Sequence, residues 1–223
     1  MIYDIRETDA LIIVDTLNDF TPKGNLPVKD GHKIMKPIVE LAMAFHAKKA
    51  KIVATQDWHP DDHFSFYENH EGANPFDIIE CDYGNQTLWT KHCVAGSSGA
   101  DFHKDVIPAI NLANIIIRKG TNPKVDSHSA FYENDHKTST GLGAWLRSLR
   151  IKRCYFVGLA FDYCVAYSAL DCVKESMDAV VIKDLTKSIK IEFQDGTNSE
   201  DDMINQFKLN HVKLINLNEI EGM

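Results

Sequence analysis

Short apolar runs recur along the chain, and longer stretches of mixed polar and apolar residues separate them. The runs are rich in β-branched residues and bounded by polar ones, which is typical of buried strands in a parallel sheet. This pattern predicts six strands, over residues 10–14, 51–55, 112–117, 153–158, 179–183 and 211–216.

The longer stretches contain segments in which large apolar residues recur at helical spacing. These segments predict helices over residues 31–49, 140–149, 163–176 and 199–209. Because strands and helices alternate, we expect a parallel sheet that helices cover on both faces. Two other stretches, roughly 56–100 and 120–136, follow neither pattern, and irregular segments of that length are usually functional.

Charged or nucleophilic residues follow four of the predicted strands. They are Asp15 after the first strand, Asp57 after the second, Lys119 after the third and Cys164 after the fourth. In an open parallel sheet, ligands bind beyond the carboxyl ends of the strands, where the strand order reverses. With six strands in the order 3-2-1-4-5-6, these four residues would converge on one pocket.

Length and composition narrow the class of protein. The 223 residues are enough for a sizeable core, and no linker or repeat divides them, so we expect a single domain over 1–223. No apolar run approaches the roughly 18–20 residues that a membrane-spanning helix needs. The N-terminal MIYDIRETDA has no basic-then-apolar signal pattern, so we expect a cytoplasmic protein.

Charge and cysteine content exclude further classes. Lys and Arg number 24 and Asp and Glu 32, and this net charge of −8 gives no overall attraction for nucleic acid or an anionic membrane. We therefore expect neither as a partner. The five cysteines are an odd number without CxxC spacing, which argues against a disulfide framework and leaves room for a reactive thiol.

Cys164 is the candidate nucleophile, because it follows a strand at the start of a predicted helix. The dipole and free amides of a first helical turn stabilise a thiolate and can hold an oxyanion, so we expect a lowered thiol pKa. The alternative is a buried core cysteine, a common environment for free cysteines. Cys154 and Cys172 fit that alternative better.

Asp15 and Lys119 are the candidate proton-transfer partners of this thiol. Burial at a strand end would raise the pKa of Asp15 into a range that suits proton transfer. Lys119 would place positive charge near the thiol. Each residue alone could equally be structural, Asp15 as a cap or ion-pair partner and Lys119 as a solvated lysine. Their common placement at strand ends favours the functional interpretation.

A second group of residues has the composition of a metal site. Asp57 and His59 are two residues apart, so both side chains point the same way in an extended segment. His63 follows closely, and His92 lies in the same long irregular stretch. Imidazoles with a carboxylate suit Zn²⁺, with Fe²⁺ and Mn²⁺ as alternatives. Surface or core histidines remain the other interpretation, and we favour His92 over its neighbour Cys93 as a ligand.

Five sequence blocks lie in order between residue 10 and about residue 182: VDTLNDF, TQDWHPDDHFSF, LWTKHCVAGSSGADF, RKGTNPKVDSHSAFYEN and GLAFDYCV. Together they resemble the nicotinamidase branch of the isochorismatase-like cysteine hydrolases. The resemblance implies a three-layer α/β/α sandwich on a six-stranded, mainly parallel sheet. It also implies metal-dependent hydrolysis of nicotinamide to nicotinate and ammonia through a thioester, in NAD salvage, with pyrazinamide as a further substrate.

The resemblance also implies a role for individual residues. Asp15, Lys119 and Cys164 would be catalytic, and the backbone amides of Ala160 and Cys164 would form the oxyanion hole after a cis Leu159–Ala160 peptide. The implied substrate contacts are Phe20, Trp89, Leu159 and Tyr163. One divalent ion, Zn²⁺ before Fe²⁺ or Mn²⁺, would bind Asp57, His59 and His92, with His63 as a further ligand or a water-mediated neighbour.

Four positions depart from the family pattern. Thr16 and Leu17 replace Met and Gln, His128 stands in DSHSAF, and Phe161 stands in GLAFDYCV. The stretch 64–89 is also longer than in compact members. These changes bear on substrate fit and rate rather than on the type of reaction.

Two rival functions stay open. One is a related amidase that acts on another small amide or an N-carbamoyl compound and needs no metal. The other is a non-catalytic binding protein on the same fold, which would have no need of the aspartate, lysine and cysteine together. The partner in every case is a small molecule, and homo-oligomerisation is open.

Overall fold

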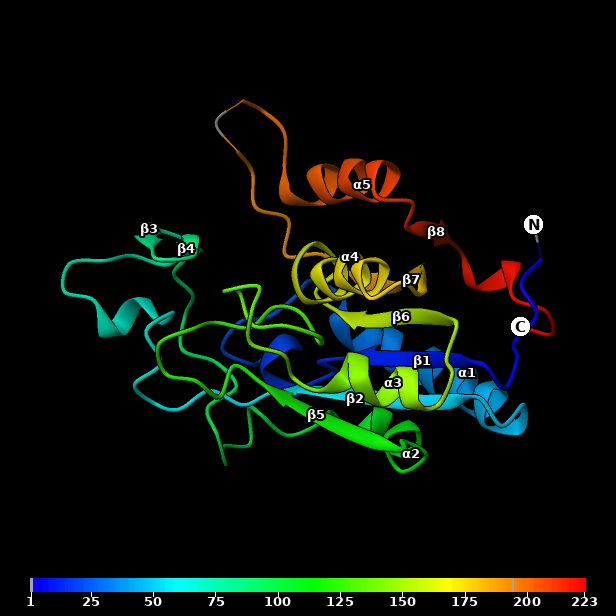
Figure 1. Cartoon of the computed structure of the whole chain (residues 1–223). Coiled ribbons are helices and arrows are strands. Elements are labelled where there is room, and N and C mark those ends of the chain that lie inside the picture. The colour runs from blue at the N-terminus through cyan, green and yellow to red at the C-terminus, as the bar shows by residue number, and fades with distance from the viewer. Residues whose placement is uncertain (1, 194) are drawn as a thin grey trace.

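A six-stranded parallel sheet forms the centre of the computed structural model, which describes residues 2–193 and 195–223 (Figure 1). Its strands are β1 (Asp9–Val14), β2 (Lys51–Asp57), β5 (Ile115–Lys119), β6 (Arg153–Leu159), β7 (Asp178–Lys187) and β8 (Lys213–Ile215). The order β5-β2-β1-β6-β7-β8 is the predicted 3-2-1-4-5-6, and each pairing between neighbours is parallel. The predicted sheet is therefore confirmed.

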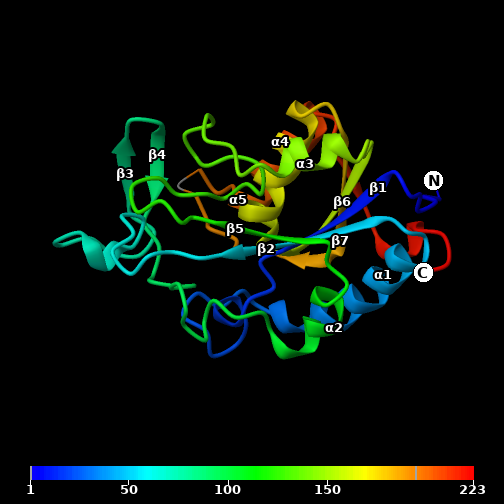
Figure 2. The same cartoon turned by 60° about the horizontal axis from the view of Figure 1, so that its bottom comes forward.

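Helices cover both faces of this sheet. They are α1 (Met35–Ala47), α2 (Ile107–Ile110), α3 (Leu142–Ser148), α4 (Ala166–Lys174) and α5 (Ser199–Leu209). Figure 2 shows α1 and α2 on one face and α3 and α4 on the other, where α5 packs on α4. This is the three-layer sandwich that the resemblance implied.

Each face of the sheet has its own apolar core, because successive strand residues point to opposite sides. In β1, Leu11 and Ile13 pack with α1, whereas Ala10, Ile12 and Val14 pack with α3, α4 and α5. All five are fully buried. Burying one large aliphatic side chain is worth about 1.5–3 kcal/mol, so β1 anchors both layers.

Several element boundaries differ from the prediction. The third strand begins at Ile115 rather than at 112, because the backbone amides of Leu112 and Ala113 bond back to α2. The first helix is preceded by a 3-10 turn over Gly31–Ile34. Short turns also cover Asn18–Phe20, Tyr67–Asn69, Lys104–Val106 and Leu217–Glu219, and a π-turn covers Phe161–Val165.

The long stretch 56–100 contains a hairpin that the sequence analysis missed. Its strands β3 (Ile78–Cys81) and β4 (Gly84–Thr87) pair antiparallel and stand outside the main sheet (Figure 1). They are short and mostly exposed, so they lack the apolar alternation that marks a half-buried strand.

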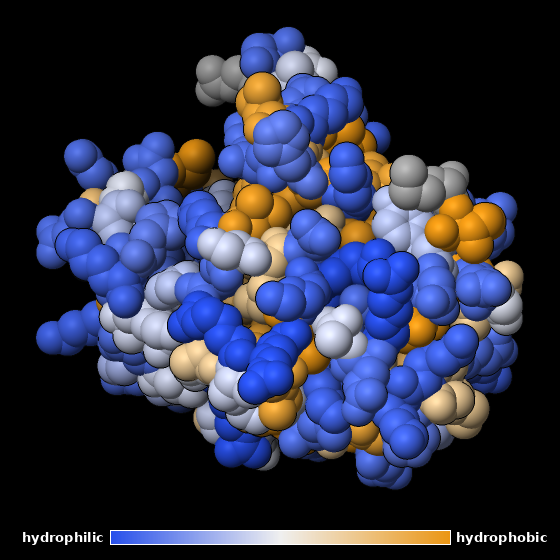
Figure 3. Space-filling view, turned by 45° about the vertical axis from the view of Figure 1, so that its right-hand side comes forward, coloured by the Kyte–Doolittle hydropathy of each residue, from blue (hydrophilic) through white to orange (hydrophobic). Residues whose placement is uncertain are grey.

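The face on the side of the chain termini is mixed in hydropathy. Figure 3 shows this face covered mostly by hydrophilic residues, with apolar residues scattered between them. Within residues 2–193 and 195–223, no helix has the length and apolar content that a membrane crossing requires.

Candidate active site and metal centre

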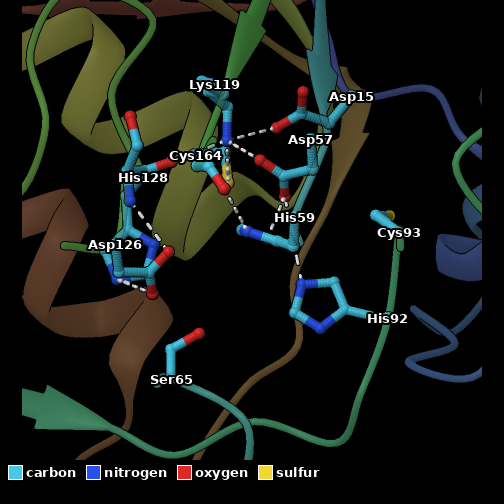
Figure 4. A network of polar contacts seen from close by, with 12 residues as sticks. Asp15, Asp57, His59, Ser65, His92, Cys93, Lys119, Asp126, His128 and Cys164 are labelled. Atoms are coloured by element: carbon cyan, nitrogen blue, oxygen red, sulfur yellow. Dashed lines mark hydrogen bonds and ion pairs between the residues drawn. The ribbon is translucent and has the colours of Figure 1, made fainter. Parts of the chain in front are cut away.

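The residues that follow adjacent strands converge at one end of the sheet (Figure 4). Asp15 directly follows β1, Asp57 ends β2 and Lys119 ends β5. Cys164 lies in the short π-helical turn, Phe161–Val165, that follows β6. Because β5, β2, β1 and β6 are neighbours in the sheet, their ends bring these four side chains together as the strand order predicted.

Lys119 contacts each of the other three residues of this group. Its Nζ lies 2.9 Å from Asp15 Oδ2 and 3.3 Å from Cys164 Sγ, and it also forms an ion pair with Asp57. The lysine is buried, so the solvated alternative is wrong. Although burial acts to lower it, the two carboxylates hold the pKa of Lys119 well above its usual range. The ammonium therefore stays charged.

Asp15 is a buried carboxylate with a shifted pKa. Burial and the neighbouring Asp57 raise the pKa of Asp15 to about 6, against the lowering effects of Lys119 and Thr55. Thr55 Oγ1 donates a hydrogen bond of 2.6 Å to Asp15 Oδ1. The predicted raised pKa is confirmed, and it suits a group that must both accept and return a proton.

The predicted low pKa of Cys164 is wrong. Burial raises the pKa of the Cys164 thiol well above its usual value, although Lys119 acts to lower it. The carboxylates of Asp15 and Asp57 also oppose a negative sulfur. The resting group is therefore a thiol, and a nucleophilic thiolate requires proton transfer to a nearby base.

The turn that carries Cys164 has the predicted cis peptide between Leu159 and Ala160. The carbonyl of Ala160 accepts hydrogen bonds from the amides of Tyr163 and Val165, at 3.2 and 3.1 Å. These bonds fix the turn against the end of β6. Ala160 and Cys164 both line the same pocket.

The histidines beside this pocket have their ring nitrogens oriented for a metal ion. His59 Nδ1 donates to the carbonyl of Gly120 at 2.9 Å, and His92 Nδ1 donates to that of Thr90 at 2.7 Å. A carbonyl can only accept, so each Nε2 keeps its lone pair. These Nε2 atoms lie 3.8 and 4.0 Å from Asp57 Oδ2.

This group fits a divalent ion. The ligand atoms of Asp57, His59 and His92 all lie within 4.8 Å of one another and are buried. Burial lowers the pKa of His92 to about 4, so its imidazole is neutral, as a ligand must be. Two imidazoles and a carboxylate suit Zn²⁺ and similar ions. His63 is adjacent, with its ring 4.6 Å from that of His59.

The pocket beside the thiol and the metal group is small and largely apolar. Among the predicted substrate contacts, Phe20, Trp89 and Tyr163 line it. The rings of Trp89 and Tyr163 meet edge to face, with centroids 4.8 Å apart. Leu159 does not line this pocket, and its fully buried side chain belongs to the core on the α1 face.

The four departures from the family pattern fall in different places. Leu17 lies in the core on the α1 face and Thr16 is fully buried. Phe161 packs against Phe207 of α5, with ring centroids 5.6 Å apart. Only His128 of these four lines the pocket, where its ring meets those of Trp89 and Tyr163.

Sequence reasoning missed two buried carboxylates. Asp126 lines the pocket and bonds to Gln86 of β4 at 2.8 Å. Asp162 accepts hydrogen bonds from the amides of Ile189 and Lys190 and so ties the nucleophile turn to a distant segment. Both residues lie within quoted blocks, DSHSAF and GLAFDYCV, but no spacing rule marked them.

Comparison with known proteins agrees with this geometry. The isochorismatase domain model matches residues 9–207. A nicotinamidase of Acinetobacter baylyi is 47% identical over 182 residues, which are 81% of this chain and 81% of that protein.

Two solved structures extend the comparison. A nicotinamidase and pyrazinamidase of Acinetobacter baumanii has 44% identity and a TM-score of 0.87, over 94% of this chain and 96% of that one. A pyrazinamidase of Pyrococcus horikoshii in complex with zinc has 32% identity and a TM-score of 0.72, over 94% and 99%. The chain belongs to the isochorismatase family.

Proposed function

We propose that this chain is an amidohydrolase that converts nicotinamide to nicotinate and ammonia, and that it also accepts pyrazinamide. The observation that carries the proposal is the buried contact of Lys119 with Asp15 and Cys164, beside a His–Asp group in an apolar pocket. The names of the relatives, nicotinamidase and pyrazinamidase, support this substrate class. The metal-ligand set favours it over a related amidase that needs no metal.

Acylation uses the thiol and its neighbours. Asp15 accepts the proton of the Cys164 thiol while Lys119 stabilises the forming thiolate at 3.3 Å. The sulfur attacks the carboxamide carbon, and the backbone amides of Ala160 and Cys164 receive the oxyanion. Asp15 then gives the proton to the leaving nitrogen, so that the C–N bond breaks and ammonia departs from a thioester.

Deacylation reverses the proton path. Asp15 takes a proton from a water molecule, which attacks the thioester carbon. The C–S bond breaks, nicotinate leaves, and the sulfur regains its proton. Because Asp15 acts in both halves, a pKa near its value of about 6 suits both directions of transfer.

Asp57, His59 and His92 would hold the metal ion, with His63 as a further ligand or a neighbour. Such a divalent ion, Zn²⁺ before Fe²⁺ or Mn²⁺, would supply a Lewis acid for the basic ring nitrogen of the substrate. Phe20 and Trp89 exclude water and hold the flat ring.

The proposal also includes the domain organisation of the chain and its metabolic role. A single domain over 1–223 is supported by the family match over residues 9–207 and by one continuous sheet from β1 to β8. Production of nicotinate would place the chain in NAD salvage.

Ammonia release from nicotinamide by the metal-loaded protein tests the proposal. We expect release by the wild type and a loss of at least about 10³-fold in Cys164→Ala, because this variant removes the thiol that contacts Lys119. Cys172→Ala, which changes a buried cysteine of α4, is the matched control and should retain activity. Turnover by Cys164→Ala would contradict Cys164 as the nucleophile. A metal-loaded wild type that releases no ammonia from nicotinamide would contradict the substrate assignment.

A further inference from the structure

The exposed hairpin β3–β4 reaches the pocket wall through Gln86. This side chain is 1% exposed, whereas the other residues of the two strands are exposed or half-buried. The hairpin also stands outside the main sheet (Figure 1). A buried polar side chain in such an element is not explained by hydrophobic packing, so its hydrogen bonds indicate its purpose.

The amide of Gln86 uses its full capacity for hydrogen bonds, which is two donated and two accepted. Its Nε2 donates to Asp126 Oδ2 at 2.8 Å and to the carbonyl of Thr87 at 2.7 Å. Its Oε1 accepts from the Tyr83 hydroxyl at 3.2 Å and from Asn134 Nδ2 at 3.3 Å. A buried polar network that is fully satisfied holds the groups it joins in one arrangement.

The same network reaches His128 through the partners of Gln86. The Asp126 carboxylate accepts from the amide of Ser127 at 2.8 Å, and the Asp126 carbonyl accepts from the amide of Asn134 at 2.7 Å. Asn134 Oδ1 accepts from the amide of His128 at 3.0 Å. Gln86 therefore fixes Asp126 directly and His128 through Asn134.

The segment of Gln86 also carries an aromatic residue of the pocket. Trp89 lies just after β4 and lines the pocket, as do Asp126 and His128. The rings of Trp89 and His128 meet edge to face with centroids 6.0 Å apart, and Asp126 lies next to His128 (Figure 4). The bond from Gln86 to Asp126 thus joins two wall segments that are 40 residues apart in sequence.

We propose that Gln86 is a positioning residue for the substrate ring. Its bonds to Asp126 and Asn134 form a clamp between the two wall segments, and this clamp sets the fit of the pocket to a flat, unsubstituted aromatic amide. The inference rests on the proposed function for this substrate class. Loss of the clamp weakens binding of the ring and leaves the chemical step intact, because the main sheet and the turn after β6 position the nucleophile and its proton-transfer partners.

Steady-state kinetics of the metal-loaded protein with nicotinamide and 5-methylnicotinamide test this inference. Gln86→Met keeps the length of the side chain and removes its hydrogen bonds. We expect KM for nicotinamide to rise at least about tenfold while kcat stays within about threefold, which is the signature of lost binding rather than lost chemistry. The wild type should prefer nicotinamide by about 10–200-fold, as a rigid pocket does against one extra methyl group, and the variant should lose at least about threefold of that preference.

Two further variants separate the clamp from a general effect on the hairpin. Asn134→Ala removes the link from Gln86 to His128 and leaves the bond from Gln86 to Asp126, so KM should rise at least about threefold. Asn85→Ala changes the exposed neighbour on the same strand and is the matched control, which should stay within about twofold of the wild type. Circular dichroism checks folding, and Asn134→Ala keeps the test usable if Gln86→Met does not fold.

The clamp would be overturned if folded Gln86→Met and Asn134→Ala both keep the KM and the substrate preference of the wild type. An equal fall of kcat and kcat/KM would also overturn it, because the loss would then lie in the chemical step. With a wild type that turns over nicotinamide, either result overturns the clamp alone.

A wild type that releases no ammonia overturns the proposed function, and hydrogen exchange then decides on the clamp. The amides of Ser127 and His128 bond to acceptors that Gln86 holds. They should exchange at least about tenfold faster in Gln86→Met than in the wild type. Unchanged exchange at both amides overturns the clamp.

Discussion

The Lys119 ammonium lies among Asp15, Asp57 and Cys164 without access to solvent. Buried charges need opposite charges and hydrogen bonds to offset their desolvation. The carbonyl of Ser127, 2.9 Å from Nζ, completes this shell. Lys119 therefore offsets the charge of the two buried carboxylates and places a positive charge where it can stabilise a negative sulfur.

The pH dependence of turnover should report Asp15. Burial and Asp57 raise the pKa of Asp15 to about 6, and only the ionised carboxylate can accept the thiol proton. Therefore kcat/KM for nicotinamide should rise with pH through about 6, and it should fall about tenfold per pH unit below that. A profile that stays flat from pH 7 to pH 5 would contradict Asp15 as the base.

Thr55 should tune that profile. Its hydroxyl donates to the Asp15 carboxylate at 2.6 Å and so favours the ionised form. In Thr55→Val the pKa of Asp15 rises further, and the acidic limb of kcat/KM should move up by about one pH unit. Thr55→Ser keeps the hydroxyl and should hold the limb near its original position. Equal shifts in both variants would point to packing rather than to the hydrogen bond.

At the scale of elements, β6 carries the chain from the core to the nucleophile turn. Gly158, one residue before the end of this strand, has a φ of +109° and lies against the backbone of Val14 in β1. A side chain there would be strained and would also force β1 and β6 apart. No substitution at this point leaves both the strand pairing and the turn intact.

Gly158→Ala should therefore destabilise the fold. We expect its free energy of unfolding to fall by about 2–4 kcal/mol in chemical denaturation. Gly72→Ala is the matched control, since Gly72 also has a positive φ, +76°, but faces open space. It should cost only about 1 kcal/mol. Similar losses in both variants would mean that close contact with β1 adds nothing.

Asp162 connects the nucleophile turn to the start of α5. Its carboxylate accepts hydrogen bonds from the amides of Ile189 and Lys190, at 3.0 and 2.8 Å, and from Ser199 Oγ at 2.5 Å. In Asp162→Ala these donors lose their acceptor, and the free energy of unfolding should fall by about 2–4 kcal/mol. Asp162→Asn retains one acceptor oxygen and should lose less. If Asp162→Ala is as stable as the wild type in thermal and chemical denaturation, these hydrogen bonds do not stabilise the fold.

At the scale of the whole molecule, the metal ligands join segments that are far apart in sequence. Asp57 ends β2, His59 follows it, and His92 lies beyond the β3–β4 hairpin. Binding of an ion to the folded state alone should stabilise it, by about 4 kcal/mol at a thousandfold excess over Kd. Removal of metal by a chelator should lower the melting temperature, and added Zn²⁺ should restore it. Unchanged melting in both directions would contradict a metal site in the folded chain.

The sequence by itself determined the main-sheet strands, their order and the residue types at their ends. The strands and the residues at their ends are local features, because burial on both faces demands continuous apolar runs. The strand order followed from the general pattern of open parallel sheets, in which the carboxyl ends of the strands lie at one edge. The β3–β4 hairpin was not predicted, because its exposed strands contain no such apolar run.

Only the tertiary structure decided the protonation state of Cys164 and the set of groups around His59. The pKa of Cys164 rises rather than falls, because burial and two carboxylates outweigh the lowering effect of Lys119. Asp126 meets His59 and His63 across long sequence distances, which no spacing rule encodes. Desolvation and contact between distant segments arise only when the chain is packed, and both depend on every neighbour at once.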